Sequence, residues 1–152
     1  MKISAIDLGS GTIKFSAFEV GEGPRARPLA LDEINTELRR GMGADCLLQA
    51  GPIADTLAAV EVFTAQAKKL GLPTPPAYGT SALRKAKNRE ALFGPMKERF
   101  GIEAVLLSEE DEGRLNLLGV GAGRWPARRP GIVVDPGGDS TDCAWGTDWK
   151  TA

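Results

Sequence analysis

Apolar and polar residues alternate near the start of the chain with the period of a strand that buries one face. The alternation is clearest in residues 12–20, and a shorter apolar segment at residues 2–7 precedes it. The buried face of the longer segment would carry Ile13, Phe15 and Ala17. Residues 9–11, Gly-Ser-Gly, separate the two segments and are typical of a tight turn, and a weaker strand pattern follows at residues 26–39. We therefore expect an antiparallel three-strand meander first.

From residue 53 the hydrophobic period lengthens to that of a helix. The apolar positions on this face are Leu57, Val60, Phe63, Ala67 and Leu70. Pro52 suits the first turn of a helix and Gly71 suits the position after its last turn. The pattern predicts a helix over residues 53–70.

The rest of the chain alternates short strands with helices. We expect a short strand running into a turn at 77–84, a helix from Asn88 to Gly101 that Pro95 kinks or splits, and a buried strand at 103–107. Ser108 and Asp111 have the spacing of a capping box, before a helix that turns Leu115 and Leu118 inward. A strand at 131–135 and a segment at 140–146 then form a second hairpin. This order predicts an α/β fold with an antiparallel edge and right-handed crossovers.

The two hairpins share a pattern in which an aspartate precedes a glycine-bearing turn. The first reads AIDLGSGTIK and the second VVDPGGDSTD, so Asp7 and Asp135 occupy matching places. Glycine turns expose backbone N–H groups that can bind phosphate, and an aspartate beside phosphate can act as a ligand to Mg²⁺. An ordinary β-turn would explain one copy of this pattern equally well, but it would not require an aspartate before the turn in both copies. Two facing turns would hold a phosphate and its metal from both sides.

The composition of the chain excludes several kinds of active site. The chain has 152 residues with 19 basic and 20 acidic side chains, a net charge of -1, two cysteines and no histidine. Without histidine there is no Ser-His-Asp triad and no zinc site with imidazole ligands. A general base must then be a carboxylate, lysine, tyrosine or cysteine.

Composition also bears on partners and location. Dense runs of Lys or Arg are missing, and we interpret the short basic stretch at 124–130 as a solvated loop, so we expect neither a nucleic acid nor a membrane as a partner. Two cysteines are too few for a disulfide scaffold, and the N-terminus lacks a signal-peptide pattern. We expect a cytoplasmic protein.

Four ordered segments resemble the exopolyphosphatase and guanosine pentaphosphate phosphohydrolase (Ppx/GppA) family, within the superfamily of actin, sugar kinases and chaperone ATPase domains. The segments are AIDLGSGTIKFSAFEV, YGTSALRKAKNREALF, LLSEEDEGRLNLLGV and VVDPGGDSTDCAWG. The resemblance implies a ribonuclease-H-like domain pair with the active site in the cleft between the domains. It further implies Mg²⁺-dependent release of terminal phosphate from polyphosphate or from pppGpp, and does not decide between these substrates.

The resemblance also assigns roles to residues. Phosphate would be bound by Gly9, Ser10 and Gly11 of the first turn and by Gly137, Gly138, Ser140 and Thr141 of the second. Asp7 and Asp135 would hold the metal. The phosphate-binding arginine falls on Arg84 and the catalytic glutamate on Glu112. Without the resemblance, Arg84 would be interpreted as part of a solvated basic surface. Glu112 would be interpreted as a glutamate that the helix dipole favours in a first helical turn.

The chain departs from the family pattern at both acidic motifs. In the second turn Pro136, Asp139 and Asp142 replace Ile, Gly and Glu, and a carboxylate at position 139 repels phosphate unless it turns outward or binds the metal. In the segment before Glu112, the altered order SEEDEG leaves three competing acids for the role of base. These are Glu109, Glu110 and Asp111.

The resemblance suggests a division at residue 125. Residues 1–125 would form an N-terminal ribonuclease-H-like domain, and residues 126–152 would begin a second domain whose remainder is absent. Two other functions remain open, an actin-like kinase or ATPase and a non-catalytic phosphate-binding or regulatory fragment. An incomplete second domain further predicts self-association or a missing domain or subunit.

Overall fold

A five-stranded sheet is the centre of the fold in a computed structural model, which describes residues 1–21, 26–121, 130–137 and 141–146. The meander consists of β1 (Lys2–Leu8), β2 (Thr12–Val20) and β3 (Ala26–Asn35), all antiparallel. β4 (Ala77–Gly79) pairs in parallel with β1, and β5 (Val105–Leu106) pairs in parallel with β4. The sheet order is β3-β2-β1-β4-β5, which confirms the predicted α/β arrangement with an antiparallel edge.

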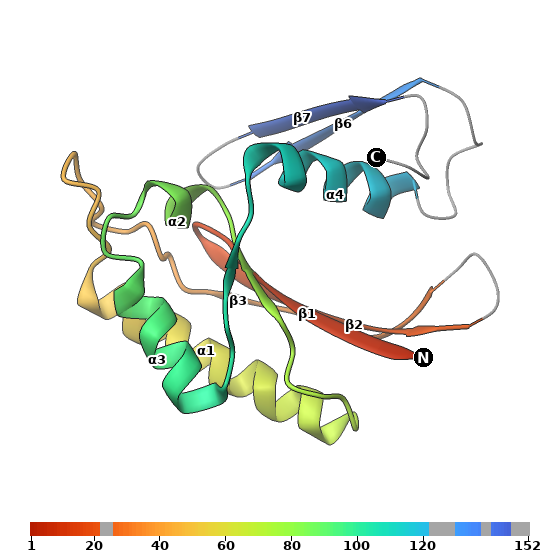
Figure 1. Ribbon diagram of the computed structural model, residues 1–152, viewed down its shortest axis with the longest axis horizontal. Helices are drawn as coiled ribbons and strands as arrows, with labels where there is room; N and C mark the ends of the chain where they lie inside the picture. Colours follow the sequence, from red (N-terminus) through yellow and green to blue (C-terminus); the bar gives the residue numbers. More distant parts are fainter. Residues whose placement is uncertain (22–25, 122–129, 138–140, 147–152) are drawn as a thin grey trace.

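Two helices, α1 (Ala50–Lys69) and α3 (Glu90–Phe100), cover one face of this sheet (Figure 1). The strand side chains buried beneath them are Ile6, Leu8, Ile13, Phe15 and Ala17, as the alternation predicted for the second strand. Phe15 stacks on Phe63 of α1 with ring centroids 5.5 Å apart. Burial of a side chain of this size contributes about 2 kcal/mol to stability. This core fixes the turn between β1 and β2 at one end of the sheet.

The ends of α1 and α3 differ in part from the prediction. α1 begins three residues early, at Ala50, which leaves Pro52 still within its first turn. The predicted N-cap of α3, Asn88, lies two residues before the helix, and its amide instead pairs with the backbone N–H and C=O of Leu48. Two hydrogen bonds across the fold have replaced the local cap. α3 also continues as one helix past Pro95, so the predicted split does not occur.

α4 (Glu109–Gly121) begins with the predicted cap, and of the two leucines predicted to face inward Leu118 is half-buried and Leu115 is not. Ser108 Oγ accepts a hydrogen bond from the Asp111 N–H at 3.0 Å and donates one to its carboxylate at 2.8 Å. Leu117 is buried, whereas Leu115 is 45% exposed, so the inward orientation predicted for Leu115 is wrong. The reason is that the second hairpin covers the stripe through Gly113 and Leu117.

The second sheet contains two antiparallel strands, β6 (Gly131–Pro136) and β7 (Thr141–Gly146). It lies against α4, on the side of the first sheet opposite α1 and α3 (Figure 1). Its outer face exposes Ile132, Val134 and Trp145, by 71%, 58% and 78% respectively. Within the described residues, every helix is too short or too polar to cross a bilayer.

Candidate active site

The turn between β1 and β2 faces the β6–β7 hairpin across a pocket of about 310 Å³. The described residues that line it are Asp7, Gly9, Ser10, Gly11, Thr12, Lys14, Glu33, Thr80, Ser81, Glu112, Asp135, Pro136, Gly137 and Asp142. Seven of the residues predicted for the site are in this wall. The fold thus brings the two matching turns to one place.

The first turn requires glycine at its first position. A Cβ atom on Gly9 would lie 2.5 Å from the carbonyl oxygen of Thr12, a distance that real Cβ atoms do not show. A Cβ on Gly11 would meet no atom within 4 Å. The close approach at Gly9 allows the chain to reverse within four residues and present its backbone to the pocket.

Backbone hydrogen bonds from the loop after β3 fix the orientation of this turn. The N–H groups of Thr36 and Glu37 donate to the carbonyl of Gly11 at 2.9 and 2.7 Å, and that of Arg39 donates to the carbonyl of Ser10 at 3.0 Å. In a trans peptide the N–H points opposite to the carbonyl of the preceding residue. Because both carbonyls face the loop, the N–H groups of Gly11 and Thr12 face away from it. Two successive amides on one side make a concavity for an anion.

Arg84 and Glu112 form an ion pair beside the pocket. Arg84 Nη1 lies 2.6 Å from Glu112 Oε2, and the side chains are only 18% and 15% exposed. The same nitrogen donates to the carbonyl of Leu107 at 3.1 Å. Arg84 belongs to α2 (Ser81–Lys85), which packs so closely on β4 that a Cβ on Gly79 would lie 2.7 Å from Leu83.

Glu112 is the one acid of its cluster that faces the pocket. It lies in the first turn of α4, which the Ser108 cap starts. The three competing acids, Glu109, Glu110 and Asp111, are exposed. Burial and the Arg84 contact therefore favour Glu112 for the role that the resemblance assigns to it.

The electrostatics of the pocket are centred on Asp7. Loss of hydration raises the pKa of Asp7 above its usual value of 3.8, although the residue keeps an exposed surface. Lys14 opposes this rise in the pKa, and the charges of Glu112 and Asp135 add to it. Three carboxylates this close together repel one another, so a cation bound among them would be favourable.

The second turn places two carboxylates opposite each other. Asp135 and Asp142 are directly paired across β6 and β7, and both line the pocket. Like charges in this position repel, and Asn116 of α4 donates a hydrogen bond to Asp135 at 3.1 Å. Thr141 begins β7 but is not part of the pocket wall. Gly138, Asp139 and Ser140 lie outside the described residues.

Sequence reasoning missed Lys14, Glu33, Thr80 and Ser81 in the pocket wall. Strand register could have identified Lys14 and Glu33, because Lys14 on β2 is paired directly with Asp7 on β1 and with Glu33 on β3. The three side chains thus form a row of alternating charge on one face of the sheet. Thr80 and Ser81 lie between β4 and α2, and no periodicity identifies such positions.

The donor set fits Mg²⁺ in one mode of binding. Among the described residues, no three acidic or cysteine side chains are grouped closely enough to hold a metal ion alone. Mg²⁺ in phosphoryl-transfer sites is held through one or two carboxylates, with substrate phosphates and water as the other ligands. Asp7 and Asp135 match this mode, since they line one pocket and the charge of Asp135 acts on Asp7.

Comparison with known families identifies the family of this chain. The sequence profile of the Ppx/GppA phosphatase family matches residues 19–152, which is most of the chain. The chain belongs to this family. The matched range includes Arg84, Glu112 and the second glycine turn, and begins after the first.

Curated relatives of this Ppx/GppA chain include exopolyphosphatases. It is 25% identical over 150 residues to Exopolyphosphatase 1 of Mycobacterium tuberculosis, an alignment that covers 97% of this chain and 43% of the relative. Exopolyphosphatase 1 of Mycobacterium leprae is 23% identical over the same length. The chain spans less than half the length of these relatives.

Solved structures of Ppx/GppA proteins confirm the fold. The Aquifex aeolicus family member superposes with a TM-score of 0.86 at 25% identity, covering 99% of this chain and 48% of that one. An exopolyphosphatase from Cytophaga hutchinsonii superposes with a TM-score of 0.88 at 20% identity, covering 97% of this chain and 47% of that one. The predicted fold and family are thus confirmed.

Proposed function

We propose that this chain forms one side of the active site of an exopolyphosphatase, which releases the terminal phosphate of inorganic polyphosphate or of pppGpp. The observation that carries the proposal is the convergence of both glycine turns, Asp7, Asp135 and Glu112 on one pocket, with Arg84 at its edge. Membership of a phosphatase family and the exopolyphosphatase relatives support it.

In this proposal the terminal phosphate lies between the two turns. The N–H groups of Gly11 and Thr12 bind its oxygens, together with groups of the second turn, Gly137 among them. Arg84 donates hydrogen bonds to the next phosphate, because its planar guanidinium matches two phosphate oxygens. In doing so it exchanges the carboxylate of Glu112 for the substrate.

Glu112 then acts as the general base. Its freed carboxylate accepts a proton from a water molecule, whose oxygen attacks the terminal phosphorus while the bond to the bridging oxygen breaks. The bridging oxygen leaves with the electron pair as the new end of the shortened chain. Thr80 and Ser81, which also line the pocket, would orient the water.

Asp7 and Asp135 would hold Mg²⁺ at this site. When bound, Mg²⁺ neutralises charge on the phosphate oxygens during transfer. The raised pKa of Asp7 supports the assignment: loss of hydration is its main cause, the charges of Glu112 and Asp135 add to it, and a bound cation would offset all three effects on the carboxylate.

We also propose that residues 1–125 form one domain and that the β6–β7 hairpin opens a second. The hairpin lies on α4, and no strand pairing in the described residues links it to the first sheet. The relatives are more than twice as long as this chain, and their remaining part would complete the second sheet and close the cleft. The chain alone should then hydrolyse polyphosphate very poorly, because phosphoryl transfer depends on positioning and exclusion of water.

Titration with phosphate and tripolyphosphate tests the binding step. With Mg²⁺ present, the backbone amide resonances of Gly9, Gly11, Gly137 and Gly138 should shift, and without Mg²⁺ the shifts should be much smaller. Resonances on α1 provide the internal control. Unmoved amides at both turns would reject the proposal.

A further inference from the structure

One side of α4 carries the proposed base and also contacts a proposed metal ligand. Glu112 and Asn116 are one helical turn apart in sequence, so their side chains lie on the same side of the helix. Glu112 lines the active-site pocket. Asn116 Nδ2 lies 3.1 Å from Asp135 Oδ2 of β6 and donates a hydrogen bond to it. The helix that supplies the base therefore also reaches the second hairpin.

The second hairpin packs on α4. A Cβ atom on Gly113 would lie 3.5 Å from the Cβ of Ala144, and one on Gly146 would lie 3.7 Å from Cδ1 of Leu117, which are ordinary contact distances. No strand pairing in the described residues joins this hairpin to the first sheet. Packing on α4 thus sets where the second hairpin lies relative to the proposed base.

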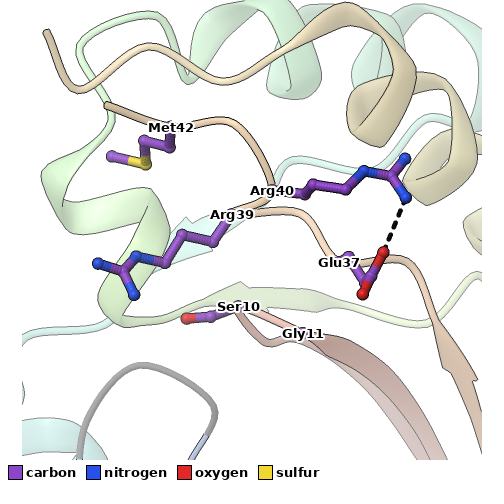
Figure 2. Close-up of a pocket in the computed structure, with 6 residues that line it drawn as sticks. All are labelled: Ser10, Gly11, Glu37, Arg39, Arg40 and Met42. Atoms are coloured by element: carbon purple, nitrogen blue, oxygen red, sulfur yellow. Dashed lines mark hydrogen bonds and ion pairs between the residues drawn. The ribbon is translucent and has the colours of Figure 1, made fainter. Parts of the chain in front are cut away.

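The first turn is held by other means. Backbone hydrogen bonds join it to the loop after β3, in which Arg40 lies 2.7 Å from Glu37 (Figure 2). Asp7 belongs to β1, which pairs with β2 on one side and with β4 on the other. The sheet therefore fixes Asp7, whereas Asp135 belongs to a two-stranded hairpin and has a side-chain contact with α4.

An uncharged amide is well suited to orient a carboxylate that binds a cation. Ionised carboxylate oxygens only accept hydrogen bonds, so the Asn116 amide turns its nitrogen toward Asp135. A lysine or arginine in that place would offset the negative charge that attracts the metal, whereas the amide leaves this charge intact. The hydrogen bond engages Oδ2 and leaves Oδ1 for a ligand. Carboxylates that bind metals are in turn hydrogen-bonded, and loss of such a partner lowers metal affinity.

We infer that Asn116 is a positioning residue, which orients the carboxylate of Asp135 for Mg²⁺ from the helix that carries Glu112. The inference rests on the proposed function, because that function makes Asp135 a metal ligand. Asn116 is not among the described residues that line the pocket, so it acts through Asp135 and does not contact the phosphate.

Binding of Mn²⁺ to the full 152-residue chain tests the inference. Mn²⁺ favours the same oxygen ligands as Mg²⁺, and its unpaired electrons broaden the amide resonances of nearby residues such as Gly9 and Gly137. In Asn116→Leu, which removes the amide at nearly equal size, the Mn²⁺ affinity measured in this way should fall by about tenfold or more. Asn116→Gln keeps an amide donor and should lose less. Both variants should unfold close to the temperature of the unsubstituted chain, since the hydrogen bond is exposed.

Gln66→Leu is the matched control. Gln66 of α1 donates to Asp32 of β3, so this variant also removes a hydrogen bond between an amide and a carboxylate, but outside the pocket. Its Mn²⁺ affinity should equal that of the unsubstituted chain. An equal loss in Gln66→Leu and Asn116→Leu would overturn the inference, because the effect would not depend on Asp135. Equal losses in Asn116→Leu and Asn116→Gln would overturn it too, since the amide donor would then be irrelevant.

Asp135→Asn separates the inference from the proposed function. Weaker Mn²⁺ binding in Asp135→Asn, together with normal binding in Asn116→Leu, would overturn the inference alone. If Asp135→Asn binds Mn²⁺ as the unsubstituted chain does, or if the unsubstituted chain binds none, the metal site of the proposed function fails and the inference fails with it.

Discussion

Arg84 Nη1 lies 2.6 Å from Glu112 Oε2, in a region where both side chains are mostly shielded from water. The ion pair joins the proposed phosphate ligand to the proposed base before substrate is present. Phosphate that draws Arg84 away would free the Glu112 carboxylate only when substrate is bound.

Replacement of Glu112 by Gln should lower phosphate release by about two to four powers of ten with little change in substrate affinity, as expected for loss of a general base. The measurement is steady-state phosphate release from polyphosphate, by a protein that carries both this chain and the proposed second domain. Glu110→Gln, on the exposed side of the same helical turn, is the control and should keep near-normal turnover. The reverse result would move the base to Glu110.

Loss of the Arg84 guanidinium should destabilise the ligand-free chain. Arg84→Ala leaves the Glu112 carboxylate shielded and without this partner, at a cost of about 2 kcal/mol in the free energy of unfolding. The double variant Arg84→Ala, Glu112→Gln should lose less than the sum of the single losses, because the unpaired charge is gone. Urea denaturation of the four proteins measures this. Additive losses would show that the pair contributes nothing to stability.

Asp7 should make the ligand-free chain less stable as pH rises. Its pKa is raised in the folded state, so between 3.8 and that raised pKa the folded chain binds more protons than the unfolded one. The unfavourable contribution is absent below pH 3.8 and complete above the folded-state pKa. Asp7→Asn should therefore melt at a higher temperature than the unsubstituted chain at pH 7, by a margin that shrinks as pH falls. A constant margin across pH would contradict the assignment.

The neighbours of Asp7 should move its pKa in opposite directions. Lys14→Met removes an opposing charge and should raise the Asp7 pKa further, whereas Asp135→Asn removes a like charge and should lower it toward 3.8. Carboxyl resonances followed by NMR through a pH titration give both values. Shifts of the same sign in the two variants would contradict the charge arrangement of the pocket.

The first turn should tolerate a methyl group at one glycine and not at the other. Gly9→Ala places a Cβ 2.5 Å from the Thr12 carbonyl oxygen and should cost about 1–3 kcal/mol in stability, as overpacking does. Gly11→Ala has open space and no positive φ, so it should stay within about 0.5 kcal/mol of the unsubstituted chain. Thermal unfolding distinguishes them. Equal losses would mean that the turn differs from the one described.

The outer face of the second hairpin should drive self-association. Ile132, Val134 and Trp145 expose apolar surface on a sheet that has only two strands within the described residues, and the edges of such a sheet recruit other chains. Trp145→Ser should lower the association measured by sedimentation across a concentration series. Leu31→Ser, which removes an exposed leucine from β3 of the first sheet, should not. A chain that stays monomeric at every concentration would contradict the prediction.

Local patterns predicted the elements well, and long-range packing decided the details that they missed. The alternation at Ile13 and Phe15 reports a buried face directly, so the meander was predictable. Leu117 was not, because the face of α4 that is buried depends on a hairpin that comes later in the chain. Asn88 shows the same limit, since its amide bonds to Leu48, 40 residues away, in place of the helix that follows.

The candidate site shows a similar division. Asp7 and Asp135 were identified from the repeated turn itself, while Arg84 and Glu112 required the family resemblance, because an arginine among basic residues and a glutamate in a first helical turn are common on surfaces. Lys14 could have been predicted from strand register. Arg39 could not, since its place beside Ser10 follows from an irregular loop.

The hydrogen bonds from the loop to Ser10 and Gly11 also bear on how this site can change over evolutionary time. The turn presents backbone N–H groups to the pocket, and the peptide planes set the direction in which these groups point. Replacing a side chain therefore does not reverse it. Homologues that keep the turn and its loop would inherit a preference for anions even where every neighbouring side chain has diverged. Substrate identity could then drift among phosphorylated compounds, while the capacity to hold a phosphate is retained.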